Sequence, residues 1–172
     1  MSRKRIIFSP FRIIRYFYLR FQRLRGNPRS LALGTAIGVF IGLTPTLPFH
    51  TVSIIPLTIL CNASTLAALI SGFLVSNPLT IFFHYYFAWV IGNFLFPGRL
   101  TWTTIQSVLG VLTEGGFAEG IRTITGLGFN AILVMLSGGI LLALPLAILS
   151  YCLSYRFFLK IKQKRREKHL LK

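Results

Sequence analysis

Long apolar runs interrupted by prolines dominate the pattern of hydrophobic and polar positions along the chain. From Leu31 to Phe96 the sequence contains no Lys, Arg, Asp or Glu. Within this uncharged block stand Pro45, Pro48, Pro56 and the pair Asn77-Pro78. Because proline removes a backbone donor and clashes with the preceding helical turn, one straight helix cannot run through the block. The pattern therefore predicts several short helices.

The uncharged block divides into two similar halves, which predict broken helices over residues 31–61 and 62–96. Each apolar piece of the first half has about 13 residues and would reach about 20 Å, short of the roughly 30 Å hydrocarbon core of a bilayer. These two pieces form either a re-entrant hairpin or a pair of tilted crossings. In the second half, Asn62 is a candidate N-cap, and the segment after Pro78 is long enough to span.

The rest of the chain completes an all-α prediction. Residues 1–30 place large apolar side chains at helical spacing among arginines, which predicts a basic amphipathic helix in the head-group layer. Residues 97–128 are expected to lie at the interface, residues 129–155 to form a last spanning helix, and residues 156–172 to form a basic cytoplasmic tail. The expected fold is a polytopic integral membrane protein whose transmembrane domain covers residues 31–155.

Composition and charge support this class. Hydrophobic residues make up 53% of the 172 residues and charged residues 13%, whereas a soluble domain carries about 25% charged residues. The net charge of +16 comes from the two ends: nine basic residues lie at or before Arg29 and eight at or after Arg156. By the positive-inside rule, both termini should lie in the cytoplasm, after an even number of crossings of the bacterial inner membrane.

The basic N-terminal segment predicts contact with anionic phospholipids of the bilayer. Arg12, Arg15, Arg20 and Arg23 are the expected lipid-surface contacts. Nucleic acid would also attract these charges, but it does not need Ile and Phe at helical spacing. The pattern therefore favours lipid and predicts no nucleic-acid binding.

Small residues recur at the spacing of a helix face. Gly34, Gly38 and Gly42 are each four residues apart, and Gly72 lies in the second half of the block. A face without side chains lets another backbone approach closely, which predicts helix packing at these glycines. The same face could line a ligand groove or support a homo-oligomer, and the sequence leaves these alternatives open.

Polar residues inside the uncharged block are the candidates for contact with a substrate or a lipid head group: Ser76, Asn77, Thr80, His50, Thr51 and Asn62. A half-helix beginning after Pro78 would point its partly positive end at the Asn77 break, where a phosphate could bind. Alternatively, Asn77 and Thr80 only cap the broken helix ends. Histidines and acids are too few and too scattered for catalysis or a metal site, so we expect no enzyme activity and no cofactor.

The sequence resembles one bacterial inner-membrane family, known only as a domain of unknown function (number twenty sixty-two). The resemblance covers roughly residues 10–160 and is carried by the pattern Ala32-x-Gly34-x-Ala36-x-Gly38, by Pro45, by Asn77-Pro78-Leu79-Thr80 and by the later Tyr85, Tyr86 and Gly92. The chain departs from the family pattern at Pro48 and His50. The resemblance implies a protein of the bacterial cytoplasmic membrane and supplies no activity.

Two functional hypotheses follow from the sequence. In the first, the protein is transporter-like or handles lipids, with a polar site at the Asn77-Pro78 helix break. In the second, it is a non-catalytic membrane adaptor that docks a cytoplasmic or envelope-assembly enzyme through its basic termini.

Overall fold

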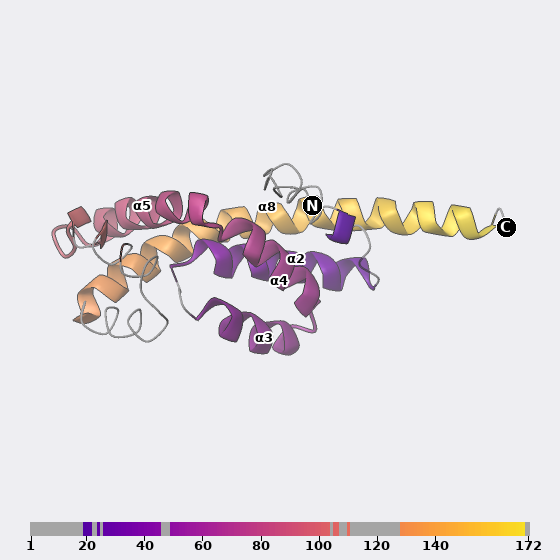
Figure 1. Ribbon diagram of the computed structural model, residues 1–172, viewed down its shortest axis with the longest axis horizontal. Helices are drawn as coiled ribbons and strands as arrows, with labels where there is room; N and C mark the ends of the chain where they lie inside the picture. Colours follow the sequence, from indigo (N-terminus) through magenta and orange to yellow (C-terminus); the bar gives the residue numbers. More distant parts are fainter. Residues whose placement is uncertain are drawn as a thin grey trace, which may run out of the picture.

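The computed structural model describes residues 19–21, 24, 26–45, 49–103, 105–106, 110 and 128–170, and every regular element within them is helical. The helices labelled in Figure 1 are α2 (Pro28–Leu43), α3 (His50–Leu60), α4 (Thr65–Val75), α5 (Pro78–Leu95) and α8 (Gly128–Leu170). The all-α prediction is confirmed. Residues 1–18 of the expected amphipathic helix and most of the expected interfacial region lie outside the described residues.

Helix α8 is the axis on which the other helices are arranged. It has 43 residues and is therefore about 65 Å long. Helix α5 lies along its first part and α2 along its later part (Figure 1). Both run antiparallel to α8. Along α5, Ala88 contacts Gly138 and the later Gly92 contacts the earlier Val134. Along α2, Leu31 packs with Phe158, whereas Pro45, just after the helix, contacts the earlier Gly139.

Helices α2 and α4 run parallel to each other and in close contact. A Cβ atom added at Gly34 would collide with the backbone of Ser64, and one added at Gly38 with the carbonyl oxygen of Ala68. One turn further along, a Cβ at Gly42 would lie 3.3 Å from the carbonyl oxygen of Gly72. The spacing of glycines along α2 therefore allows the two backbones to approach nearly to touching.

Helix α3 connects α2 to α4 along the chain, packs beside both, and contributes one anchoring side chain to their core. Ile54 is 3% exposed and packs with Ile37, Ile41 and Ala68. Its Cδ1 atom lies 3.1 Å from the position that a Cβ of Gly72 would take. The rest of the helix is more open, since Val52 and Ile59 are about two-thirds exposed.

A second contact between backbones joins α5 to α8. A Cβ at Gly92 would collide with the carbonyl oxygen of Val134, and one at Gly138 with that of Ala88. At the adjacent position, Gly139 lies against the ring of Pro45, just after α2. The pair Gly138-Gly139 is therefore the point on α8 where the contact with α5 gives way to the contact with α2.

One boundary differs from the expectation. The N-cap of α4 is Ser64, whose Oγ accepts from the amide of Ala67 at 3.3 Å, and not Asn62. Asn62 instead takes a left-handed conformation with φ of 51° in the turn after α3. Asparagine tolerates this conformation better than most residues, because its short side chain can bond locally.

The basic segment after Tyr155 is helical, because α8 continues without a break through Arg156 to Leu170. The last spanning segment and the basic segment are one helix, with Phe158 and Ile161 packed against the residues that precede and begin α2. The C-terminal segment is therefore part of the packed structure.

Among the described residues, one helix is long and apolar enough to cross a membrane by itself, the part of α8 from Ala131 to Glu167. The pair α4 and α5 meets the same criterion together, with a bend of 87° between them, whereas α2 and α3 are shorter. The core helix of a soluble protein can meet this criterion too, but only 28% of the apolar window of α8 is buried inside the chain.

The contact at Gly38 gives a first prediction. The substitution Gly38→Ala should separate α2 from α4, because the added methyl collides with the backbone carbonyl group of Ala68 as well as with Ser71 Oγ, and the backbone cannot turn aside. Overpacking of this kind costs about 1–3 kcal/mol, so the protein purified in detergent should melt at a clearly lower temperature.

Two matched substitutions make this test specific. Gly42→Ala adds the same methyl at 3.3 Å from its neighbours and should be mild, and Gly110→Ala meets nothing within 4 Å. Equal melting temperatures for Gly38→Ala and Gly110→Ala would contradict the close packing of α2 on α4.

Candidate functional site

Three helix ends meet at a small polar cluster: the end of α2, the start of α3 and the break between α4 and α5. Ser76 Oγ donates to the carbonyl oxygen of Gly42 at 2.8 Å. His50 Nε2 bonds to the carbonyl oxygen of Ile41 at 2.6 Å. A carbonyl can only accept, so this nitrogen carries the proton. The same nitrogen lies 3.5 Å from Ser76 Oγ.

Asn77 and Thr80 join the two sides of the helix break. At the start of α5 they form a reciprocal pair, in which Asn77 Oδ1 accepts from the amide of Thr80 at 3.1 Å and Thr80 Oγ1 accepts from the amide of Asn77 at 3.2 Å. Toward α4, Asn77 Nδ2 donates to Leu74 O at 3.2 Å, and Thr80 Oγ1 donates to Val75 O. Both side chains therefore satisfy backbone groups that the break leaves without helical partners.

Hydrogen bonds within the protein occupy this cluster. Among the described residues, no buried side-chain nitrogen or oxygen lacks a partner. A ligand could therefore enter the break only by replacing a bond between helix ends, such as that from Ser76 to Gly42. Within the same part of the chain, no three of the His, Cys, Asp and Glu side chains are grouped as they would be to hold a metal ion.

The structure brings together some of the predicted site residues and separates others. Ser76, Asn77, Thr80 and His50 lie around the break, and Thr51 follows His50 with its side chain exposed. Asn62 lies at the other end of α2, where its carbonyl oxygen accepts from Ser30 Oγ at 3.1 Å. Ser30 and Gly42 are 12 positions apart on α2, which corresponds to about 18 Å along the helix axis.

One residue that ties helices together was not singled out from the sequence. Ser71 is 5% exposed, and its Oγ donates across the α2–α4 contact to the carbonyl oxygen of Thr35 at 3.1 Å. Ser71 in α4 and Ser76 just after it thus both donate hydrogen bonds to backbone carbonyl groups of α2. The signal in the sequence was the repeat of small residues at Ala67, Ala68, Ser71 and Gly72.

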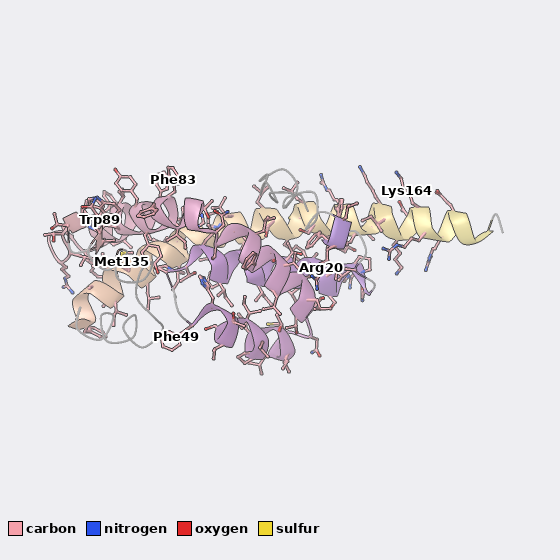
Figure 2. All side chains as sticks on the ribbon, in the orientation of Figure 1. Arg20, Phe49, Phe83, Trp89, Met135 and Lys164 are labelled. Carbon is pink, nitrogen blue, oxygen red and sulfur yellow. The ribbon has the colours of Figure 1, made fainter. Side chains whose placement is uncertain are left out.

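The described part of the basic N-terminal segment lies against the C-terminal part of α8. The rings of Phe21 and Phe158 are 4.9 Å apart, and Arg165 Nη1 donates to the carbonyl oxygen of Leu24 at 3.2 Å. Arg20 is exposed, and Figure 2 shows it in the same half of the molecule as Lys164. The other expected lipid contacts, Arg12, Arg15 and Arg23, lie outside the described residues.

Large apolar side chains cover the outside of the other half. Phe83 is 64% exposed and Phe94 86%. On α8, exposed leucines and isoleucines continue as far as Leu153, after which the exposed long side chains are mainly Lys and Arg. Figure 2 shows Phe83 and Phe49 on this half, away from Lys164. Exposed apolar surface of this extent is typical of proteins that meet another apolar phase.

The apolar outer surface, the basic end and one helix that is long and apolar enough to span a membrane together suggest that the chain associates with a membrane. A family model matches residues 11–167, and the chain belongs to this family, described as an uncharacterized protein conserved in bacteria (DUF2062). The resemblance predicted from the sequence is confirmed. No curated protein and no solved structure matches the chain.

The reciprocal bonds at the break give a second prediction. Asn77→Ala removes both the acceptor for the Thr80 amide and the donor to Leu74, so the purified protein should lose about 1 kcal/mol of stability. Asn77→Ser keeps an acceptor at the N-cap and should recover most of that loss. Thermal unfolding in one detergent would measure both, and an Asn77→Ala protein as stable as the wild type would exclude the capping role.

Proposed function

We propose that this chain is an integral, non-catalytic protein of the bacterial cytoplasmic membrane that handles lipids. The observation that carries the proposal is the exposed apolar surface of α3, α4, α5 and the first part of α8. No charged residue lies between Leu31 and Phe96 to make this surface soluble. Transfer of apolar surface from water to hydrocarbon is favourable by about 25 cal/mol of free energy per Å². This surface is therefore more stable in contact with lipid than with water.

The arrangement of the two basic segments supports a cytoplasmic location for both ends. Phe21 and Leu24 pack on the part of α8 that carries the C-terminal cations. Segments in contact with each other lie on one side of a bilayer, and an excess of Lys and Arg favours the cytoplasmic side. Membrane topology with an even number of crossings fits this arrangement.

The polar cluster at the α4–α5 break supports the lipid-handling part of the proposal. It is a group of polar side chains where three helix ends meet, inside a block without charged residues. Non-helical backbone at membrane depth is tolerated only where protein or a wet cavity satisfies it. Because its groups already bond to one another, we propose that these hydrogen bonds hold the helix ends together when no ligand is bound. A lipid head group would enter by taking over the bonds of Ser76 and His50 to the end of α2.

The adaptor hypothesis is the second candidate, and one observation favours it. The last turns of α8 extend beyond the other described helices (Figure 1) and carry exposed cations such as Lys160 and Lys164. A helix that projects from the membrane in this way could bind an acidic surface of a cytoplasmic protein. Charge reversal at Lys160 and Lys164 should then abolish partner binding and leave membrane insertion unchanged.

A third prediction tests insertion directly. After a wash with alkaline carbonate, which removes peripheral proteins, the full-length chain should stay in the membrane pellet, and it should enter solution only with detergent. The apolar surface described above gives the physical reason. Recovery of a monodisperse protein from the carbonate supernatant, in buffer without detergent, would contradict the proposal.

A fourth prediction concerns topology. Fluorescent protein fused to either terminus should fluoresce in living cells, whereas alkaline phosphatase fused at the same positions should be inactive. That enzyme needs disulfides, which form outside the cytoplasm. Active phosphatase at one terminus alone would require an odd number of crossings and would refute a cytoplasmic location for both ends.

A further inference from the structure

A groove lies where α2 begins and the basic part of α8 passes it. Its volume is about 450 Å³, within the range of sites that hold small molecules. The floor is apolar and includes Leu24, Pro28, Leu31, Phe158 and Ile161. Leu31 and Phe158 are almost fully buried, at 3% and 2% exposed.

The rim of the groove is cationic. Lys162, Arg165 and Arg166 line it, and no acidic residue does. Lys162 lies four residues after Phe158, Arg165 four after Ile161, and Arg166 four after Lys162, so one face of α8 supplies both the apolar floor and the cations. Arg165 also donates to the carbonyl oxygen of Leu24 at 3.2 Å, which holds the near wall in place.

The position of the groove matches the boundary between hydrocarbon and head groups. The exposed apolar residues of α8 end at Leu153, and the basic residues begin at Arg156. The first residue of α8 that lines the groove is Phe158, about one helical turn after Leu153. The floor of the groove therefore adjoins the apolar surface, and its rim lies among the cations. The N-terminus of α2 adds a partial positive charge beside it.

We propose that this groove binds one anionic phospholipid of the cytoplasmic leaflet, with its phosphate at Lys162 and Arg166 and the start of an acyl chain on Phe158 and Ile161. This inference rests on the proposed membrane location and assigns a second lipid contact, separate from the α4–α5 break. Charge complementarity selects the occupant. The lysines and arginines before Leu24 carry the same charge as the rim and cannot take the place of the phosphate, and a nucleic acid has no use for the apolar floor.

The chain offers a matched pair of variants for the test. Lys162→Gln with Arg166→Gln removes two charges from the rim. Lys160→Gln with Lys164→Gln removes two charges at the same spacing from exposed positions of the same helix. Each control residue lies two positions from a rim residue, about 200° around the helix, and therefore on the opposite face. Both double variants keep Arg165 and the packed floor.

Native mass spectrometry of the full-length protein in detergent would measure binding of added phosphatidylglycerol and phosphatidylcholine. We expect one phosphatidylglycerol bound in preference to phosphatidylcholine. The rim variant should bind phosphatidylglycerol about thirtyfold more weakly, the effect of two cations at a membrane surface, and the control variant should bind it within about twofold of the wild type. Inorganic phosphate should compete poorly, because it cannot use the apolar floor.

Three results would overturn the assignment. Equal losses in both double variants would mean diffuse attraction to the basic helix, and equal binding of the two lipids would remove the role of the rim. Efficient competition by inorganic phosphate would identify a site for a free anion. In each case the carbonate wash tests membrane insertion separately. The lipid assignment of the groove can therefore be wrong while the proposed membrane location is still supported.

Discussion

The direct contact of helix backbones at glycine is the interaction on which the rest of the structure depends. In the uncharged block, ion pairs are absent by composition, and in lipid the hydrophobic effect does not drive one helix against another. What remains is close packing and hydrogen bonds between helices. Gly34 and Gly38 provide the first on α2, and Ser71 and Ser76 provide the second by donating to α2 carbonyls.

Close contact at glycine occurs again on α8 and sets the order in which the other helices lie along it. Gly138 receives the backbone of α5, and Gly139 receives Pro45 at the end of α2. Because these glycines are adjacent, the two helices lie along successive parts of one long helix. Their meeting point is near the α4–α5 break, which explains why polar groups from several helix ends gather there. The break is satisfied internally by Asn77 and Thr80 and joined to α2 and α3 by Ser76 and His50.

The two surfaces on which the proposed function depends lie at the two ends of this arrangement. Toward α5 the molecule presents aromatic and aliphatic side chains, and toward the end of α8 it presents cations. An apolar half next to a basic end matches the order of layers in the cytoplasmic half of a bilayer, from hydrocarbon to anionic head groups. The groove beside α2 lies at the transition, where both kinds of side chain come from one face of α8.

The sequence by itself determined the helical class, the family and the positions of most helix breaks, because these follow from local chemistry. Proline disfavours the interior of a helix, and α2 ends just before Pro45 and α4 just before Pro78, although Pro56 and Pro145 stand inside α3 and α8. Gly34, Gly38 and Gly42 are four residues apart and therefore lie on one face of a helix. It misplaced the cap of α4, since Asn62 and Ser64 are both good caps and only the turn geometry chooses between them. Only the tertiary structure decided that α2 and α4 run parallel, that α8 continues through the basic segment, and that Lys162 and Arg166 share a groove with Leu31. Those facts depend on contacts between residues that are distant in the sequence, such as Gly38 with Ala68 and Leu31 with Phe158, which no local pattern encodes.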